Sequence, residues 1–466
     1  MYRGRAVDSK GIQEAITQIS DVLGQVSRSR DLLLIVAGRQ ASGICLYCFC
    51  IWKNIPVILL PEDASCEYVN HCIDRYRPSW VCTPSEFSMD RERKVCHKWE
   101  QYDLWQAVPD HGEGCGLHIA RDLAVLLPTS GSTGDIKMVM LSYKNLRANA
   151  ESIQKSLQID SGERAAVLLP ISYSYGLSVV NSTLLAGGTL LVPEDPVYDP
   201  RCWDFLESYG VTAICGVPYS YELYFRFRIF DRKLDTLRVM TQAGGRMGLE
   251  LKKRVLAESR KRNAHFAVMY GQTEATARIS CFFLDDAEDK IASVGKVIPG
   301  GQLSVFHPDS RGIGELVYQG DNIFMGYACS REDLQDRGVE YKDSARRLYT
   351  GDIGNIDQDG YIYLTGRKAR FVKLYGKRVS LDSLEETLYS LTGKQLVCVQ
   401  GNAKQERIFI LREGRDWTRE EEAGILQEIP VLRDYIVCVS IPKFPRRENG
   451  KIDYGKIQKI MENVHD

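Results

Sequence analysis

Short apolar runs alternate with helical patterns of apolar and polar residues from about residue 31 to residue 270 of the chain. The apolar runs predict buried strands at 32–37, 56–60, 79–83, 123–127, 165–169, 189–192, 211–215, 237–241 and 266–270. The stretches between them predict helices up to about residue 53, after Pro218, and at 64–75, 143–157, 175–186 and 248–261. Such alternation is typical of parallel strands joined by crossover helices, so it predicts an α/β lobe.

Two stretches depart from this alternation. Residues 84–117 are charged and weakly patterned, and we expect a loop and a covering helix there. Residues 293–327 change to short strands separated by Gly and Pro turns, including 302–306 and 314–319, and predict a β subdomain.

A basic, glycine-led segment, Gly366-Arg367-Lys368-Ala369-Arg370, precedes the last ~100 residues, which are about the size of an independent small domain. We therefore expect a large N-terminal lobe at 1–366, a hinge at 367–371 and a small, mobile α+β domain at 372–466. The predicted fold class is α/β, with the large lobe made of α/β sheets and the β subdomain.

The composition and the net charge indicate which classes of partner to expect. Of the 466 residues 44% are hydrophobic and 26% charged, and Lys+Arg 60 against Asp+Glu 61 gives a net charge of only -1. We therefore expect no nucleic-acid partner and no membrane partner. The apolar run 44–51 lies between Arg39 and Lys53 and falls short of the ~20 residues of a membrane span, so it predicts a buried helix.

The start of the chain and the cysteines indicate the compartment. After Met1 the chain enters a polar helical pattern without the apolar core of a signal peptide. The 14 cysteines are scattered, which suggests reduced thiols and a cytoplasmic location. Cys45, Cys48 and Cys50 lack a second Cys or His pair at zinc spacing, so core packing is favoured over a metal or redox cluster.

A loop of hydroxyl residues and glycines follows the run 123–127 and closes on a lysine. Glycines let backbone N–H groups turn towards an anion, hydroxyls add donors, and the lysine supplies a positive charge. The loop therefore predicts a phosphate site made of Thr129, Ser130, Gly131, Ser132, Thr133, Gly134 and Lys137. Taken alone, it is equally consistent with an ordinary surface turn. A P-loop NTPase is excluded, because the four-residue gap before Gly-Lys and the following Ser/Thr are missing.

Four further stretches make this loop part of a site. They are Met269-Tyr270-Gly271-Gln272-Thr273-Glu274-Ala275, Leu348-Tyr349-Thr350-Gly351-Asp352, Gly366-Arg367 and Pro445-Arg446-Arg447-Glu448-Asn449-Gly450-Lys451-Ile452-Asp453. The first follows a predicted strand and sets a carboxylate beside a hydroxyl, a pair able to hold Mg²⁺ against phosphate oxygens. The second carries an acidic residue able to accept from ribose hydroxyls. Each stretch alone also reads as a turn, a strand end, a basic surface or a solvated tail.

The ordered set resembles the adenylate-forming superfamily, which includes acyl- and aryl-CoA synthetases, adenylation domains of peptide synthetases, and luciferases. The resemblance covers about residues 31–457. It implies ATP and Mg²⁺ as cofactors, with the Ser/Thr/Gly loop on the β- and γ-phosphates and Glu274 on the metal. It implies that Asp352 and Arg367 bind the ribose. Adenine and phosphate contacts carry over to Gly244, Gly245, Arg246, Tyr270, Gly271, Gln272 and Thr273.

The resemblance also implies a reaction in two steps. Lys451 matches the lysine that bridges the carboxylate and the α-phosphate during adenylation, and Lys373 matches a residue near the site once the small domain has rotated for thiol transfer. The implied partners are a small-molecule carboxylic acid and coenzyme A, or alternatively the phosphopantetheine of an acyl carrier protein. Departures at Ile136-Lys137-Met138, Ser142-Tyr143 and Ala369 keep open a non-catalytic nucleotide-binding protein of the same fold.

Three residues bear on the acid. Tyr173 stands where amino-acid-activating members carry an Asp for the ammonium, in a segment that includes Gly176 and matches the family's acyl-pocket lining. A neutral aromatic gives an ammonium no counter-charge, so a fatty or aryl acid is expected. Met269 stands where many relatives have Gly, and its bulk predicts a short-to-medium or aryl acid. Plain core packing is the alternative reading of Tyr173 and Met269.

Overall fold

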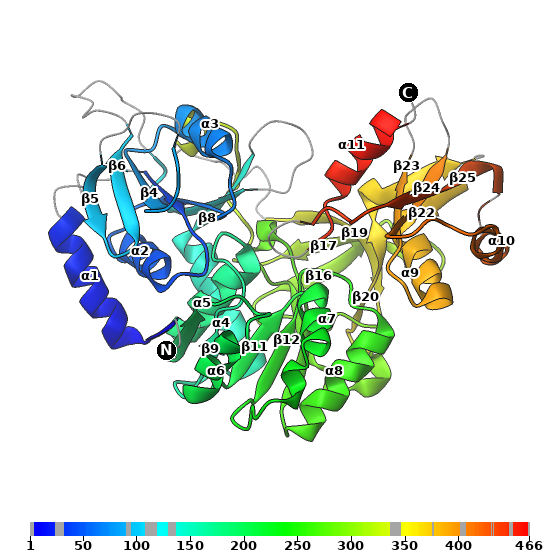
Figure 1. Ribbon diagram of the computed structural model, residues 1–466, viewed down its shortest axis with the longest axis horizontal. Helices are drawn as coiled ribbons and strands as arrows, with labels where there is room; N and C mark the ends of the chain where they lie inside the picture. The colour runs from blue at the N-terminus through cyan, green and yellow to red at the C-terminus, as the bar shows by residue number, and fades with distance from the viewer. Residues whose placement is uncertain are drawn as a thin grey trace. The chain divides into compact units, whose positions relative to one another are not determined.

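The computed structural model describes residues 4–23, 32–89, 95–107, 119–128, 137–335, 346–374, 377–400, 407–429, 431, 433–446 and 451–464 (Figure 1). The chain forms two compact units, the first made of Met1–Gln302 and Gln319–Leu348 and the second of Leu303–Tyr318 and Tyr349–Asp466. Each unit contains its own clusters of buried apolar side chains.

The first unit holds two eight-stranded sheets, and each has parallel strands at its centre. The strand order of one sheet is β1 (Gly4–Val7), β10 (Thr189–Pro193), β9 (Arg164–Ala166), β11 (Ala213–Gly216), β12 (Val239–Gln242), β13 (His265–Tyr270), β14 (Ser280–Phe283) and β15 (Lys296–Val297). The strands from β10 to β13 in this order are parallel, whereas β1, β14 and β15 pair antiparallel at the edges.

The other sheet of the first unit is built in the same way. Its order is β18 (Gly326–Ala328), β8 (Met138–Ser142), β7 (Leu123–Pro128), β3 (Val57–Leu60), β2 (Leu33–Val36), β4 (Trp80–Pro84), β6 (Tyr102–Gln106) and β5 (Val95–Trp99). The four central strands are parallel, and two antiparallel strands complete each edge. Every residue of β2 and β3 is buried, as expected for parallel strands covered on both faces.

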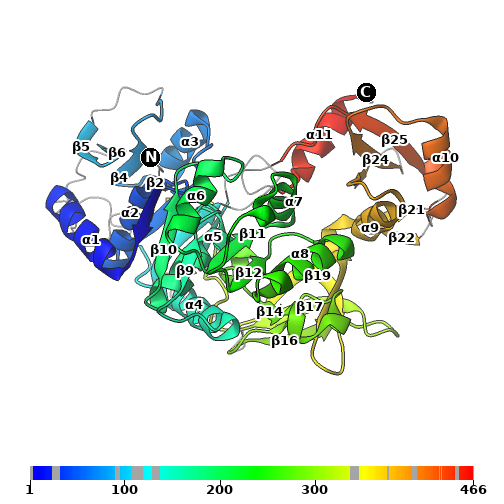
Figure 2. The same ribbon diagram turned by 60° about the horizontal axis from the view of Figure 1, so that its bottom comes forward.

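Helices cover the faces of these sheets. They are α1 (Ser9–Leu23), α2 (Ala41–Trp52), α3 (Cys66–Tyr76), α4 (Tyr143–Leu157), α5 (Ser174–Leu185), α6 (Pro200–Ser208), α7 (Pro218–Arg226) and α8 (Leu249–Lys261). α7 and α8 pack on each other and on β11 and β13 (Figure 1), and α1 lies along α2 (Figure 2). α4 begins where it does because Ser142 and Asn145 form a capping box, each side chain accepting from the other's backbone N–H.

The second unit contains smaller sheets. A four-stranded sheet has the order β16 (Gln302–Phe306), β17 (Gly314–Gln319), β19 (Leu348–Ile356) and β20 (Ile362–Arg367). A hairpin follows, β21 (Phe371–Leu374) with β22 (Lys377–Ser380), and then a three-stranded sheet of β23 (Val397–Gln400), β24 (Ile408–Glu413) and β25 (Ile436–Ile441). The helices are α9 (Leu381–Thr392), α10 (Arg419–Glu428) and α11 (Tyr454–Val464). α9 packs on β20 and β23, and α11 packs on β23.

The predicted α/β class is confirmed, including strands at 302–306 and 314–319. The expectation of a loop and covering helix at 84–117 is wrong in its described part, because β5 and β6 form an antiparallel pair there. Three consecutive side chains of β5 are exposed, which removes the apolar run that would have indicated a strand. The hinge at 367–371 stays a prediction, and within it Lys368–Arg370 form a short 3₁₀ helix, η6.

The cysteines of α2 pack as expected. Cys45 and Cys50 are fully buried in the apolar cluster of the first unit, and Cys48 packs against it. Burial raises the pKa of the Cys45 thiol to about 11 and lifts that of Cys50 well above its usual range. These thiols are therefore protonated at neutral pH and serve as small apolar side chains.

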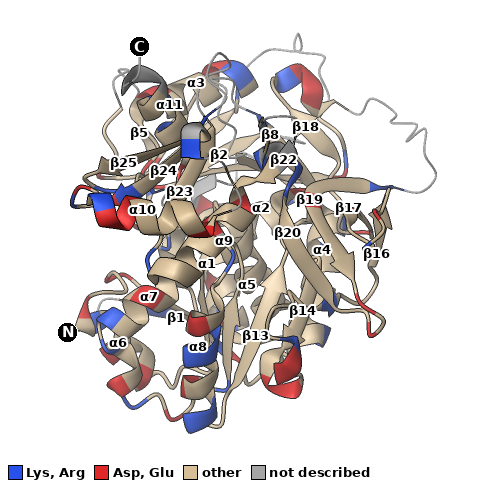
Figure 3. Ribbon diagram, turned by 90° about the vertical axis from the view of Figure 1, so that its right-hand side faces the viewer, with Lys and Arg blue, Asp and Glu red and all other residues tan. Residues whose placement is uncertain are grey.

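The described helices and surface agree with the composition. Within the ranges given above, no helix combines the length and the hydropathy that a membrane crossing requires. Figure 3 shows that Lys and Arg lie among Asp and Glu on the described elements, for example along α8 and α10. The interspersed charges agree with the net charge of -1.

Candidate active site

The predicted phosphate loop joins two neighbouring strands. Residues 129–136, which include Thr129, Ser130, Gly131, Ser132, Thr133 and Gly134, lie outside the described residues, so their role stays a prediction. The loop leaves the end of β7 and returns at the start of β8, where Pro128 pairs with Met138. Lys137 is the first described residue after the loop, and its side chain is exposed. A strand, β8, thus separates the loop from helix α4.

Lys137 and Glu274 meet at one aromatic ring. The Nζ of Lys137 lies 3.4 Å from the ring centroid of Tyr327, a cation–π contact. The hydroxyl of Tyr327 donates a hydrogen bond of 2.8 Å to Oε1 of Glu274. Burial and the neighbouring Glu274 raise the pKa of Tyr327, so its hydroxyl remains a donor. The predicted phosphate lysine and the predicted metal ligand are therefore brought together by a residue that the sequence did not single out.

The loop after β13 is fixed by close backbone packing. A Cβ on Gly271 would lie 1.9 Å from the carbonyl oxygen of Ala277, so this position accepts only glycine without rearrangement. The next residues form a 3₁₀ turn, η2 (Thr273–Ala275), which begins with the Thr273 hydroxyl 3.2 Å from the hydroxyl of Ser174. Tyr270, at the end of the strand, is only 8% exposed. Among the described residues, the buried Nε2 of Gln272 finds no acceptor.

The segment after the neighbouring strand β12 makes a second turn at the same edge. β12 and β13 are parallel and pair Gln242 with Val268, so both loops leave the carboxyl edge of the sheet. Gly244 has φ +81°, a left-handed conformation that favours glycine. The Nε2 of Gln242 donates to the carbonyl oxygen of Gly245 at 2.9 Å. Arg246 follows on the surface. Ligands of α/β sheets bind at this edge, so the placement suits a nucleotide.

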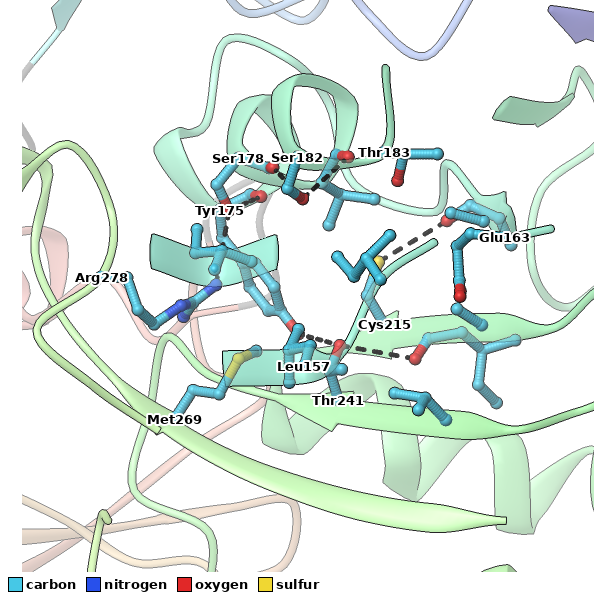
Figure 4. A pocket seen from close by; sticks show the side chains of 18 residues that line it. Leu157, Glu163, Tyr175, Ser178, Ser182, Thr183, Cys215, Thr241, Met269 and Arg278 are labelled. Carbon is cyan, nitrogen blue, oxygen red and sulfur yellow. Dashed lines mark hydrogen bonds between the residues drawn. The ribbon is translucent and has the colours of Figure 1, made fainter. Parts of the chain in front are cut away.

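The residues predicted to contact the acid lie around α5. Tyr173 is the residue before the helix, and its ring is 6.3 Å from that of Tyr175 in an edge-on arrangement. Gly176 fits closely, since a Cβ there would lie 2.2 Å from the carbonyl oxygen of Pro170. Met269 is 4% exposed and lines a cavity together with Tyr175 (Figure 4). Tyr173 and Gly176 are outside the lining of that cavity.

The second unit assembles the predicted ribose pair. Asp352 in β19 lies opposite Arg367 in β20, and the Nε of Arg367 donates to Oδ1 of Asp352 at 3.0 Å. Asp352 is 4% exposed, whereas the Arg367 side chain is 61% exposed. The backbone N–H of Arg367 also donates to Asp382 at 2.9 Å. The carboxylate is thus held by the fold, and the guanidinium reaches solvent.

The two predicted catalytic lysines also lie in the second unit. Lys451 is half-buried next to Ile452, which forms an isolated antiparallel bridge with Arg446, and α11 begins three residues later at Tyr454. Lys373 lies in β21, paired in the hairpin with Arg378 of β22, and its side chain lies outside the described residues. The catalytic roles of both lysines stay predictions.

A partly buried cluster holds the segment after Arg367. Arg370 forms ion pairs of 2.5 Å with Asp382 and 2.7 Å with Glu385. The hydroxyl of Tyr454 donates to the other oxygen of Glu385 at 2.9 Å, and the guanidinium carbon of Arg370 lies 3.9 Å from the Tyr454 ring centroid. Burial raises the pKa of Glu385. One end of the predicted hinge is therefore fixed to the body of the second unit.

A profile of the family described as AMP-binding enzyme matches residues 58–328, which is more than half of the chain. The chain belongs to the AMP-binding enzyme family. The match spans the phosphate loop, the carboxyl-edge turns and the lining of the cavity, and it confirms the resemblance to adenylate-forming ligases.

Curated relatives of this AMP-binding chain include both a peptide synthetase and an acyl-CoA synthase. The non-ribosomal peptide synthetase CmlP of Streptomyces venezuelae is 28% identical over 368 residues, which cover 76% of this chain and 36% of CmlP. A feruloyl-CoA synthase of Amycolatopsis is 28% identical over 294 residues, covering 60% of this chain and 56% of the synthase. The chain therefore spans only part of the length of these relatives.

Solved structures share the AMP-binding fold. O-succinylbenzoate coenzyme A synthetase (MenE) from Bacillus subtilis, in complex with AMP, superposes with a TM-score of 0.75 at 18% identity, covering 96% of this chain and 92% of MenE. ATP-bound MatB from Rhodopseudomonas palustris gives a TM-score of 0.73 at 18% identity, covering 98% of this chain and 94% of MatB. These likenesses establish the fold.

Two residues of this AMP-binding enzyme were not found from the sequence. Tyr327 is 39% exposed in β18, and its place between Lys137 and Glu274 depends on the pairing of β18 with β8. Arg278, which follows the η2 turn, is only 2% exposed and lines the cavity. A charged residue beside a turn is usually solvated, so its burial could not be predicted from the sequence.

Proposed function

We propose that this chain activates a carboxylic acid with ATP and passes the acyl group to a thiol. In the first step a carboxylate oxygen attacks the α-phosphorus of ATP, pyrophosphate leaves, and an acyl-adenylate forms. In the second step the thiol sulfur attacks the acyl carbonyl, AMP leaves, and a thioester forms as the thiol loses its proton. A fatty or aryl acid is the proposed substrate, and coenzyme A is the proposed thiol.

The observation that carries the proposal is the carboxyl edge of the β12 and β13 strands. The turns that hold Gly244 and Glu274 leave the sheet side by side there, within the region matched by the AMP-binding family. The closely packed Gly271 keeps the second turn near the strand end, so backbone and side-chain groups are preorganised for a nucleotide.

The adenylation step brings two anions together, so it needs positive charge. We propose that Lys137 and the residues of the loop before it bind the β- and γ-phosphates, that Asp352 and Arg367 bind the ribose, and that Lys451 bridges the carboxylate and the α-phosphate. We propose that Lys373 serves the thiol-transfer step. Exclusion of water from the site would protect the adenylate from hydrolysis.

The residues around Glu274 fit a magnesium ion. Mg²⁺ prefers oxygen ligands and usually keeps several waters beside one or two carboxylates. Glu274 is half-buried, and its neighbour Thr273 adds a hydroxyl. Bound there, Mg²⁺ would supply positive charge to the phosphate oxygens. Tyr327 orients the Glu274 carboxylate through its hydrogen bond, which leaves the second carboxylate oxygen for a metal.

The acceptor has a second candidate, the phosphopantetheine of a carrier protein. The similarity to the peptide synthetase CmlP, over 76% of this chain, favours it. Both acceptors present the same thiol arm, so the two differ mainly in what surrounds the thiol.

Acid-dependent exchange of pyrophosphate into ATP tests the first step. A panel of fatty, aryl and amino acids should show exchange with at least one fatty or aryl acid, and a preference for amino acids would contradict the substrate class. Thioester formation from the best acid with free coenzyme A, compared with a panel of carrier proteins, identifies the acceptor. A chain that binds ATP but exchanges with none of the acids would be the non-catalytic alternative.

A further inference from the structure

Among the described residues, no buried anion accompanies the buried cation Arg278. Its side chain is 2% exposed, and no described carboxylate forms an ion pair with it. In the described part of the chain its Nη2 reaches only the hydroxyl of Ser178, at 3.4 Å, and its buried Nε has no acceptor. Its guanidinium carbon lies 4.9 Å from the ring centroid of Tyr175. A guanidinium stays charged in proteins, so the positive charge is left almost uncompensated.

The groups around the guanidinium are neutral. Burial raises the pKa of Tyr175 well above its usual range, that of Cys215 to about 11 and that of Cys281 to about 12. None of these groups carries a negative charge at neutral pH. The same burial lowers the pKa of Arg278 itself, which shows how strongly the surroundings disfavour the unpaired charge.

The backbone of Arg278 is fixed in place. Its carbonyl oxygen accepts from the side-chain amides of Asn149, at 3.2 Å, and Asn322, at 2.9 Å. Two non-glycine residues with positive φ precede it, Thr276 at 54° and Ala277 at 105°. The Thr276 hydroxyl donates to the carbonyl oxygen of Asn322 at 2.6 Å, so this turn is held by several bonds. The backbone that carries the guanidinium beside the cavity is therefore held in place.

The guanidinium faces the cavity that Met269 also lines (Figure 4). The cavity has a volume of about 40 Å³. This is room for about three waters, and so for a group as small as a carboxylate. Its lining carries the hydroxyl groups of Tyr175, Ser178, Ser182, Thr183 and Thr241. Its one carboxylate, Glu163, already forms a 2.9 Å ion pair with Arg238.

We propose that Arg278 binds a second carboxylate on the acid, so that the substrate class is a short or aryl dicarboxylic acid. This inference rests on the proposed function, because it assigns the far end of the acid whose other carboxylate is adenylated. A bidentate carboxylate would give the guanidinium its missing anion, and the hydroxyls of the cavity would donate to it. An ammonium at the same place would be repelled, which excludes α,ω-amino acids of similar length.

The test compares acids that have the same shape and differ by one charge. Glutarate is paired with its monoamide, and terephthalate with its monoamide. Binding of each acid is measured by calorimetry in the presence of α,β-methylene-ATP, which binds without reacting. We expect each diacid to bind at least about tenfold more tightly than its monoamide, since burial of an unpaired charge is costly. Equal binding within both pairs, or binding of neither member, overturns the inference.

Variants locate the effect. Arg278→Met keeps the length of the side chain and removes its charge, so the diacid-to-monoamide ratio should fall at least about tenfold. Arg278→Lys should retain part of the ratio. Arg254→Met is the matched control, because Arg254 is an exposed arginine stacked on Phe225 at 4.0 Å and lies outside the cavity. A ratio unchanged in Arg278→Met overturns the inference.

Two further measurements keep the test decisive. If Arg278→Met does not fold, the ratio of the unaltered protein and that of Arg278→Lys decide the question alone. Pyrophosphate exchange with the same acids separates this inference from the proposed function. A diacid that binds through Arg278 but supports no exchange contradicts the proposed function and leaves the inference standing.

Discussion

The hydroxyl of Tyr327 donates a hydrogen bond of 2.8 Å to Oε1 of Glu274, while the ring of Tyr327 lies under the ammonium group of Lys137. One side chain thus holds an anion at its hydroxyl and a cation at its face. Because β18 carries this tyrosine and β8 follows Lys137, the pairing of the two strands sets the spacing of the charges.

Tyr327→Phe should separate the two contacts. The ring for Lys137 remains, but the hydrogen bond to Glu274 is lost, which costs about 1.5 kcal/mol for a charged acceptor. We expect KM for magnesium-ATP to rise about tenfold in pyrophosphate exchange, with little change in the melting temperature. Tyr327→Leu should raise KM for magnesium-ATP further, because the cation–π contact with Lys137 is also lost. Tyr198→Phe, at a 59% exposed tyrosine, is the control.

Asp352→Asn should weaken nucleotide binding. The change keeps the volume of the buried side chain but removes the charge that faces the Nε of Arg367 at 3.0 Å. We expect kcat/KM for ATP to fall about a hundredfold, as loss of charge-assisted hydrogen bonds implies. Fluorescence titration with nucleotide measures the loss of binding, and pyrophosphate exchange measures the fall in kcat/KM. Asp416→Asn, at an exposed aspartate of the same unit, should be neutral, and unchanged ATP binding in Asp352→Asn would refute the ribose assignment.

The lysines of the second unit should act in different steps. Lys451→Ala should abolish most exchange yet leave ATP binding largely intact, because the nucleotide is held by other residues. Lys373→Ala should spare exchange and reduce thioester formation. Lys459→Ala, on the exposed face of α11, is the control for loss of a surface charge. Normal pyrophosphate exchange in Lys451→Ala, or equal loss of both steps in Lys373→Ala, would contradict the assignment of the two lysines to different steps.

The second unit should lose stability in acid through Glu421. Its backbone bond from Thr418 and its ion pairs with Arg412 and Arg415 lower its pKa from the usual 4.5 to about 2. A carboxyl whose pKa is lower in the folded state stabilises above its unfolded pKa. This contribution is therefore present above about pH 4.5 and disappears as the pH falls towards 2.

Glu421→Gln tests this contribution. Melting temperatures measured between pH 2 and pH 7 should differ between the two proteins near neutral pH and converge as the pH falls. Glu420→Gln changes the exposed neighbour in the same helical turn and should follow the unaltered protein throughout. A difference that stays constant with pH would show that Glu421 stabilises by shape rather than by charge.

Regular elements were predictable where local signals agreed. Helix α4 has the predicted bounds, 143–157, because its apolar spacing coincides with a capping residue, Ser142. The strands buried on both faces were found from their apolar runs. The edge strand β5 was missed because three of its side chains face water, and β8 was missed because it lies directly between the glycine-rich loop and helix α4.

The site was predictable only in part. Asp352 and Arg367 were paired through the family resemblance, and their register across β19 and β20 includes a shift between Ile353 and Gly354 that the sequence pattern does not predict. Arg278 and Tyr327 were missed because their roles come from tertiary contacts with residues more than fifty positions away, Ser178 and Glu274. Local sequence carries no record of such contacts.

The burial of the α2 thiols has a practical use in labelling. Cys45, Cys48 and Cys50 react with maleimide dyes only as thiolates, which burial suppresses. Among the described cysteines, Cys96 and Cys329 are exposed, and both lie in the first unit. A fluorophore on either one, with a second introduced at the surface of α10, would report whether the units change their separation during turnover.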